Sequence, residues 1–344
     1  MKRVASLDVL RGITVALMLL VNNPGTWAAL YPPLQHAPWN GMTPTDFVFP
    51  SFLYVMGVSM YFSLRKTGFR LGWKVLRRCL LIIGIGILCN WISYWVYNHT
   101  LITDHLRWTG VLQRIGLSFG LTALLVCLVD HKWLGWIAAL LLAAYTALLL
   151  LGNGYVDGPE NILLRIDSAV LGPRHLYGRG ECVDPEGLAS TLPCVAHALI
   201  GFMTGKLLAQ KEFRRMDVWG VLLLVGGLLL QWWLPLNKKI WSPSFVLVSC
   251  GLGTLLLSVL HYLIDERSLW RHTGFFRAFG TNAIYCFLAS DVLAWVCVFV
   301  PARNWFLGAL GTTPFTSLLF ALCCVLTVYL MVLPLYRRRI FLRL

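Results

Sequence analysis

The sequence predicts an all-α fold, a polytopic bundle of about ten transmembrane helices with the N and C termini in the cytoplasm. Hydrophobic residues make up 58% of the 344 residues and charged residues only 13%, which is about half the charged share of a soluble domain. The mean hydropathy is +0.70, and apolar stretches recur from one end of the chain to the other. These values exclude a soluble globular enzyme, a disordered chain and a secreted disulfide scaffold, because too little polar surface is available.

The candidate spans are runs of about 20 mainly apolar residues, the length that a helix needs to cross the hydrocarbon core. In chain order we expect them at residues 7–29, 45–64, 75–97, 108–129, 133–151, 187–208, 217–234, 243–264, 280–300 and 314–336. No separate soluble domain fits between them, so residues 1–344 are expected to form a single integral-membrane domain.

The basic residues predict the orientation of this bundle. Twenty of the 29 Lys and Arg residues lie in loops on the N-terminal side, seven lie in the opposite loops, and two lie within spans. A bias of about three to one places both termini in the cytoplasm, since Lys and Arg collect in cytoplasmic loops. The net charge of +14 is therefore expected to face anionic lipid headgroups and not nucleic acid.

Two long loops lie on the far side of the predicted bundle, at residues 24–44 and 152–186. Loops of this size are often functional. We expect these two to form the mouth at which an acceptor molecule binds.

The ten cysteines predict no metal site. Most of them fall inside apolar runs, where cysteine packs as a small hydrophobic side chain. No CxxC motif and no Cys/His spacing typical of metal ligands occurs in the sequence.

The first candidate for chemistry is the polar stretch from Leu34 to Asp46, which leads into the second expected span. Thr45 and Asp46 are typical helix-start residues. His36 is expected close to the outer face, where a neutral imidazole can accept a proton from an amine or hydroxyl, or can itself be acylated. The structural alternative is an interfacial histidine that only hydrogen-bonds a loop carbonyl.

Polar side chains within the expected spans form a second group. Ionisable groups in a membrane are costly and tend to face cavities or partners. Arg11 lies near the cytoplasmic end of the first span, where it can snorkel or pair with Asp8. Arg114 lies about two turns in from the outer face, so it either forms an internal ion pair, with Asp46 as one candidate, or binds an anion. Asn282 is a further polar residue at depth.

Two charged clusters outside the spans each have a structural and a functional interpretation. Asp184 and Glu186 precede the sixth span, where acids favour a helix start, and as a pair they could hold a cationic or hydroxylated substrate. Arg65, Lys74 and Arg77 belong to a cytoplasmic basic cluster. That cluster fits the positive-inside pattern and could equally bind the phosphates of a cofactor.

Tryptophan is abundant, with 15 residues, and several lie near predicted outer ends. Most are expected to be belt anchors at the membrane interface. One or two could instead stack on a sugar ring. The tryptophans near predicted outer ends are Trp27, Trp39, Trp91, Trp95, Trp108, Trp241 and Trp305.

Seven short motifs in one order resemble the heparan-α-glucosaminide N-acetyltransferase family and its bacterial relatives. They are SLDVLRG from Ser6, HAPWNG from His36 followed by DFVFP from Asp46, GVLQR from Gly110, HLY from His175, DPEG from Asp184, NKKIWS from Asn237, and LYRRRIF from Leu335. Each motif alone is weak, but together they extend over essentially the whole chain.

The resemblance implies transfer of an acetyl group across the membrane, from cytosolic acetyl-CoA to the amine of a glucosamine-type sugar on the periplasmic side. It implies that His36 is catalytic and that Asn22 assists it, with Asn23 as a competitor for the second role. The candidate donor contacts, chosen from their charge, side and position within the spans, are Arg11, Arg65, Lys74, Arg77, Arg114 and Asn282. The candidate acceptor contacts are Trp39, Asn40, Asp46, His175, Asp184 and Glu186. A homodimer in a bacterial inner membrane is also implied.

Two other functions fit the same residues. A polar core in a helical bundle also suits an amino-sugar transporter, for N-acetylglucosamine-related substrates. An O-acyltransferase that acts on envelope glycans is the other alternative. Direct transfer and a route through acetyl-His36 both remain open.

Overall fold

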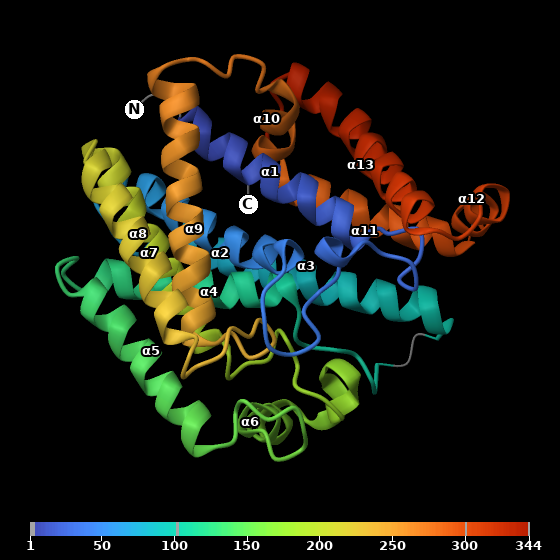
Figure 1. The fold of residues 1–344 in the computed structure, drawn as a ribbon, viewed down its shortest axis with the longest axis horizontal. Coiled ribbons are helices and arrows are strands. Elements are labelled where there is room, and N and C mark those ends of the chain that lie inside the picture. Colours follow the sequence, from blue (N-terminus) through green and yellow to red (C-terminus); the bar gives the residue numbers. More distant parts are fainter. Residues whose placement is uncertain (1–3, 101–102, 300, 343–344) are drawn as a thin grey trace. The chain divides into compact units, whose positions relative to one another are not determined.

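The structure is a computed structural model that describes residues 4–100, 103–299 and 301–342. Within these residues every regular element is helical and no strand occurs, which confirms the all-α prediction (Figure 1). Eight helices are long and apolar enough to cross a membrane, and a bent helix pair is a ninth candidate. The predicted end of one span, residue 300, lies outside the described residues.

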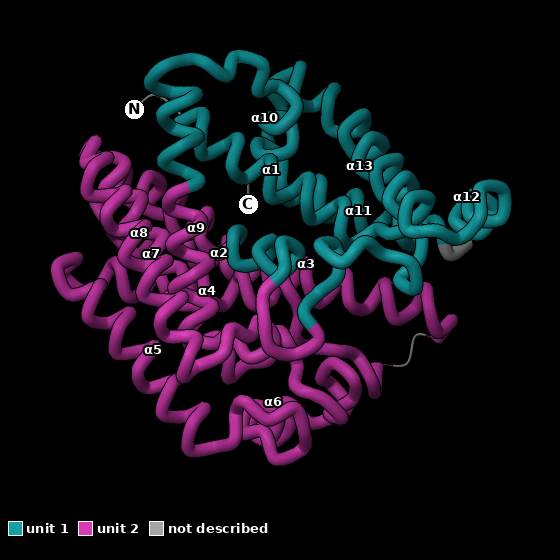
Figure 2. The backbone as a smooth tube through the Cα atoms, in the orientation of Figure 1, with its two compact units in different colours: residues 1–37, 43–52, 256–343 teal, residues 38–42, 53–255, 344 magenta. Residues whose placement is uncertain are grey.

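The chain divides into two compact units, shown in Figure 2. Unit 1 comprises residues 1–37, 43–52 and 256–343, and unit 2 comprises residues 38–42 and 53–255, with residue 344. The units share two helices, α2 (Val48–Arg65) and α9 (Pro243–His261), each of which is divided at the boundary.

Unit 1 is built around the first helix, α1 (Ala5–Asn22), which packs against α10, α11 and α13. Its core contains Val15, Leu19, Phe279 and Val328. The other elements of unit 1 are η1 (Pro32–Leu34), η2 (Pro44–Phe47), η5 (Tyr262–Glu266), α10 (Gly274–Thr281), α11 (Ala283–Phe299), α12 (Ala302–Leu310) and α13 (Pro314–Arg337).

Two glycines allow the close approach of α1 to α10. A Cβ atom on Gly12 would lie 1.8 Å from the carbonyl oxygen of Phe276, and one on Gly280 would lie 1.9 Å from that of Asp8. Since both obstacles are backbone atoms, any larger side chain would force the two helices apart. This contact brings the end of α10 beside Arg11.

The ninth candidate span is broken. The axes of α10 and α11 differ in direction by 85°, and the break falls at Asn282, which has φ −127° and ψ 41°. The sequence predicted one span at residues 280–300, so the structure corrects this prediction to two helices, the first of which begins at Gly274. The local cause is that Asn282 interrupts the helical backbone and uses its side chain elsewhere.

Unit 2 is centred on α7 (Thr191–Gln210), whose side chains are mostly buried. Helices α4, α5 and α8 all contact it, and the buried side chains of α7 include polar ones such as His197 and Thr204. The helices around it are α3 (Trp73–Asn98), α4 (Val111–Leu128), α5 (Leu134–Leu151), α6 (Ile162–Leu171) and α8 (Phe213–Leu230), with the short turns η3 (Pro173–His175) and η4 (Tyr177–Gly180).

Helix α8 differs from its predicted span at residues 217–234. It begins at Phe213 and ends at Leu230, so its first turns include Arg214, Arg215 and Asp217. With these charges α8 is not among the eight helices that are apolar enough to cross a membrane. Hydropathy alone had placed the helix too late, because charged residues at a helix start lower the apolar signal without preventing helix formation.

Candidate functional site

His36 and Asp46 form a hydrogen-bonded pair in unit 1. The distance between His36 Nδ1 and Asp46 Oδ1 is 2.7 Å. The His36 side chain is 44% exposed, whereas the Asp46 side chain is 1% exposed. The pair thus combines an accessible imidazole with a buried carboxylate, and such a carboxylate fixes the tautomer and the orientation of the ring.

The local fold holds Asp46 in place from several sides. Its Oδ2 accepts hydrogen bonds from the backbone N–H of Ala37 at 3.0 Å, and from the N–H and Oγ1 of Thr43 at 3.1 and 3.0 Å. Thr43 and Asp46 form a capping box at the start of η2. The cap at the entry to the second helix is therefore also the support of His36.

Asn22 and Asn23, adjacent at the end of α1, have different surroundings. Asn23 is 6% exposed, and its Nδ2 donates to the carbonyl of Leu19 and to Ser290 Oγ, both at 2.9 Å. Asn22 is exposed. Asn23 therefore links the end of α1 to Ser290 within unit 1, while the amide of Asn22 remains accessible.

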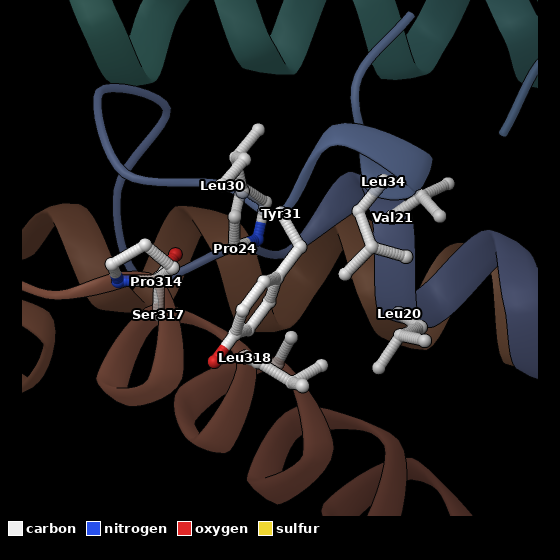
Figure 3. A pocket seen from close by; sticks show the side chains of 10 residues that line it. Leu20, Val21, Pro24, Leu30, Tyr31, Leu34, Pro314, Ser317 and Leu318 are labelled. Atoms are coloured by element: carbon white, nitrogen blue, oxygen red, sulfur yellow. The ribbon is translucent and has the colours of Figure 1, made fainter. Parts of the chain in front are cut away.

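A small apolar pocket lies beside these residues, between the end of α1, the following loop and the start of α13. Figure 3 shows the ring of Tyr31 reaching from the loop toward Leu318 of α13. Leu20, Val21, Pro24, Leu30, Tyr31, Leu34, Pro314, Ser317, Leu318 and Ala321 line it. Two of its lining residues, Val21 and Leu34, are close neighbours in sequence of Asn22 and His36.

Two of the predicted donor contacts, Arg11 and Asn282, bind protein groups in unit 1. Arg11 Nη1 lies 3.8 Å from Asp8 Oδ1 and donates to the carbonyl of Gly280 at 3.3 Å, so the predicted pairing with Asp8 is present. Asn282 is fully buried. Its Nδ2 donates to the carbonyl of Ile340 at 3.3 Å and its Oδ1 accepts from the N–H of Leu342 at 2.9 Å.

In unit 2, the residues that follow His36 in sequence lie against the second long loop. Trp39 Nε1 donates to the carbonyl of Tyr155 at 2.8 Å, and Asn40 Oδ1 accepts from Asn237 Nδ2 at 3.2 Å. The ammonium of Lys239 lies 5.5 Å from the centre of the Trp39 ring. The structure therefore brings together Trp39 and Asn40 with residues from loops 152–186 and 235–242.

Asp184 and Glu186 share one cation in unit 2, Arg107. Arg107 Nη2 lies 2.5 Å from Asp184 Oδ1 and 2.6 Å from Glu186 Oε2. Asp184 also accepts hydrogen bonds from Thr109 Oγ1 and from the backbone N–H groups of Tyr177 and Glu186. The Asp184 side chain is 0% exposed and that of Glu186 is 13% exposed. The Asp184 carboxylate is therefore fully occupied by hydrogen bonds from the protein, whereas the Glu186 carboxylate remains slightly accessible to solvent.

Burial and charge have opposite effects on the pKa of Asp184 and on the pKa of Arg107. Burial alone would raise the pKa of Asp184, but the Arg107 charge and the hydrogen bonds from Arg107, Thr109 and Tyr177 outweigh it, and the pKa of Asp184 is lowered. Burial would likewise lower the pKa of Arg107, but Glu186 and Asp184 raise it. Both groups are charged at neutral pH.

His175 holds a tryptophan in the same region. The rings of Trp108 and His175 are stacked with centres 4.5 Å apart, and the N–H of Trp108 donates to the carbonyl of His175 at 3.0 Å. His175 Nδ1 lies 2.8 Å from the carbonyl of Leu106. His175 therefore packs against the segment just before α4.

Arg114 braces the inside of unit 2. It is 1% exposed, and its Nη2 donates to the carbonyl of Gly187 at 2.7 Å and also contacts Ser190 Oγ. Its guanidinium lies 5.4 Å from the centre of the Trp241 ring. Its Nε and Nη1 have no hydrogen-bond partner among the residues that the structure describes.

The three basic residues of the predicted cytoplasmic cluster lie at the end of α2 and the start of α3 in unit 2. Arg65 is the last residue of α2, and Lys74 and Arg77 lie in the first turns of α3. All three are exposed, so each can reach an anion from solvent. In the part of the chain that the structure describes, no group of three or more His, Cys, Asp and Glu is arranged to hold a metal ion.

Sequence reasoning missed Arg107 and Thr109. Arg107 counted only as a loop charge, because it lies 77 positions from Asp184. The available signal was indirect: two acids just before a span need a cation, and Arg107 is a basic residue just before another span on the same predicted side.

The fold and the site define a multi-pass membrane protein with an exposed histidine backed by a buried carboxylate. The profile of the family described as heparan-alpha-glucosaminide N-acetyltransferase, catalytic, matches residues 3–232, and the chain belongs to this family. The chain is 29% identical to the heparan-alpha-glucosaminide N-acetyltransferase of Homo sapiens over 84% of its own length and 53% of that protein. For the protein of the same name from Mus musculus the values are 26%, 85% and 54%. The chain thus spans about half the length of the curated relatives it matches.

Proposed function

We propose that this protein is a membrane N-acetyltransferase that moves an acetyl group from acetyl-CoA to the amine of a glucosamine-type sugar. The observation that carries the proposal is the His36–Asp46 pair, whose imidazole is 44% exposed and whose carboxylate is 1% exposed. The pair lies within the segment matched by the acetyltransferase family.

In the proposed reaction His36 acts as the general base. An imidazole that donates its Nδ1 proton to Asp46 carries its lone pair on Nε2. Nε2 takes a proton from the acceptor nitrogen, which attacks the thioester carbonyl carbon. The C–N bond forms, the C–S bond breaks, and the proton passes from the imidazole to the sulfur of CoA. We propose direct transfer, in which Asn22 donates a hydrogen bond to the developing oxyanion and Asp46 positions the base.

The donor is proposed to approach from the cytoplasm. Arg65, Lys74 and Arg77 fit the phosphates of CoA, because they are exposed cations on adjacent helix ends. Arg11 on α1 is proposed to contact the pantetheine arm. For Asn282, whose amide binds the C-terminal tail, and for Arg114, which braces α4 against Gly187, we propose supporting roles.

The topology proposed for this reaction has ten spans. It consists of the eight candidate helices, the bent pair α10 and α11, and α8, with both termini in the cytoplasm and the acceptor in the periplasm of a bacterial inner membrane. The loop segments 24–44 and 152–186 are proposed to contact the acceptor, through Trp39, Asn40, His175 and Glu186. A homodimer is proposed from the family resemblance and is tested by the mass of the purified protein in detergent.

The purified protein is expected to transfer acetyl from radiolabelled acetyl-CoA to glucosamine. Product mass spectrometry separates an N-acetyl product from the O-acyl product of an envelope-glycan acyltransferase, which hydroxyl-only acceptors would also give. No labelled product with any amino sugar would contradict the proposal.

The broken span at Asn282 favours one rival function, because discontinuous helices are typical of transporters. A transporter would exchange radiolabelled hexosamine across liposomes without any acyl-CoA. Counterflow of this kind, together with absent acetyl transfer, would establish the rival.

The adjacent asparagines provide a test of the oxyanion contact. Asn22→Ala is expected to lower kcat by about 100-fold, the usual effect of removing one oxyanion donor, and to leave the thermal stability unchanged because the side chain is exposed. Asn23→Ala is the matched control. It removes two buried hydrogen bonds and is expected to destabilise the protein by about 1–3 kcal/mol. Equal kcat values for wild type and Asn22→Ala would rule out Asn22 as the hydrogen-bond donor to the oxyanion.

A further inference from the structure

Two exposed aromatic residues of unit 2, Trp108 and Tyr177, lie outside the helices that are long and apolar enough to cross a membrane. Trp108 is 50% exposed and Tyr177 is 51% exposed. Trp108 precedes α4 and Tyr177 lies in the turn η4. The two segments that carry them are joined by the hydrogen bond from Trp108 N–H to the carbonyl of His175, and Arg107, next to Trp108 in sequence, contacts the Tyr177 ring.

The Trp108 ring is fixed with one face covered. It stacks on His175 with an angle of 26° between the ring planes, and the imidazole is itself held by the carbonyl of Leu106. Half of the Trp108 residue remains accessible to solvent although its ring is stacked on His175.

The Tyr177 ring is held by the ion-pair network described above. The guanidinium of Arg107 lies 5.0 Å from the centre of the ring, and the backbone N–H of Tyr177 donates to Asp184 at 2.8 Å. Arg107 also binds Glu186. An exposed ring is therefore accompanied by a guanidinium and by a carboxylate with an accessible edge.

We propose that Trp108 and Tyr177 form a carbohydrate platform that binds pyranose rings of a glycan. The C–H face of a pyranose is apolar and slightly positive, which complements the negative face of an aromatic ring. Glu186 and Arg107 supply an acceptor and donors for hydroxyl or amino groups. Because Trp108 is stacked on His175 and Tyr177 lies against Arg107, both rings are held before binding and little side-chain entropy is lost when a sugar docks.

This platform rests on the proposed function and deepens it, since it assigns Trp108 and Tyr177 to the binding of sugar rings of the acceptor. It also distinguishes Trp108 from the other tryptophans near the predicted outer ends. A tryptophan that only anchors the protein in the lipid interface needs no fixed ring orientation, whereas a sugar-binding ring does.

The test is binding of a glucosamine tetrasaccharide to the full-length protein in detergent, measured by calorimetry without acyl-CoA. Trp108→Ala is expected to raise the Kd about tenfold, as for a central aromatic contact, and Trp108→Phe is expected to retain most of the affinity. Trp136→Ala is the matched control, because Trp136 is 72% exposed on α5 of the same unit.

The outcomes separate the platform from the transferase. Wild type that does not bind the tetrasaccharide, or Trp108→Ala that binds it equally well, would overturn the platform. Binding that depends on Trp108 in a protein that transfers no acetyl group would support the platform and contradict the proposed function. In an active enzyme, Trp108→Ala should raise the KM for the tetrasaccharide and leave kcat and the KM for acetyl-CoA unchanged.

Discussion

Replacing His36 by alanine is expected to reduce acetyl transfer by about 10²–10⁴-fold, the usual contribution of a general base. The folded structure should persist, because the His36 side chain is 44% exposed and Asp46 keeps its backbone donors Ala37 and Thr43. The measurement is kcat with glucosamine and acetyl-CoA, made alongside thermal denaturation of both proteins.

His272→Ala is the control for this experiment, since His272 is an exposed histidine of the same unit. It should retain full activity. Full turnover by His36→Ala would remove His36 from catalysis. A burst of CoA release before any acceptor is added, lost in His36→Ala, would replace direct transfer by the route through acetyl-His36.

Arg107→Leu is expected to cause the largest loss of stability, about 3–5 kcal/mol, because it leaves a buried carboxylate without its cation. Asp184 is 0% exposed and would lose the pairing partner that lies 2.5 Å away. The measurement is the midpoint of thermal denaturation in detergent. Arg165→Leu, at an exposed position on α6, is the control and should change the midpoint little.

The pH dependence of this effect follows from the pKa of Asp184. The folded state lowers that pKa, so the stabilising contribution is complete above the unfolded value of about 3.9 and is lost as the pH falls through the lowered folded value. In Arg107→Leu the buried carboxylate protonates more readily, so the difference between variant and wild type should shrink in acid. Asp184→Asn should rescue part of the loss in the Arg107→Leu background. If the difference stays constant from pH 7 to about 4, the carboxylate at Asp184 is not its cause.

The helical architecture and the location of the histidine site follow from local sequence. Apolar runs of span length predicted most of the long helices, since hydropathy over about 20 residues reflects burial in lipid or in a core. The capping box of Thr43 and Asp46 is also local. It holds Asp46, which lies only ten residues after His36 in the chain. His36 and Asp46 could therefore be singled out from one stretch of sequence, although the sequence suggested a substrate contact for Asp46 and the structure shows it beneath the imidazole.

The contacts that the sequence could not predict join distant residues. Arg107 meets Asp184 across 77 positions, Asn23 meets Ser290 across 267, and Asn282 meets Leu342 across 60. Composition and periodicity show that such polar groups need partners, but the choice of partner depends on how helices pack.

The amino-acid sequence by itself determined that this protein is a helical membrane protein with a candidate catalytic histidine in the polar stretch before its second long helix. Both properties depend on interactions within about one helix length, which the order of residues encodes directly. Only the tertiary structure decided which of two adjacent asparagines is accessible, where the ninth candidate span breaks, and which tryptophan presents a fixed ring. Each of those depends on close packing between segments that are far apart in the chain, where one backbone contact such as that of Gly280 with Asp8 sets which side chains can meet.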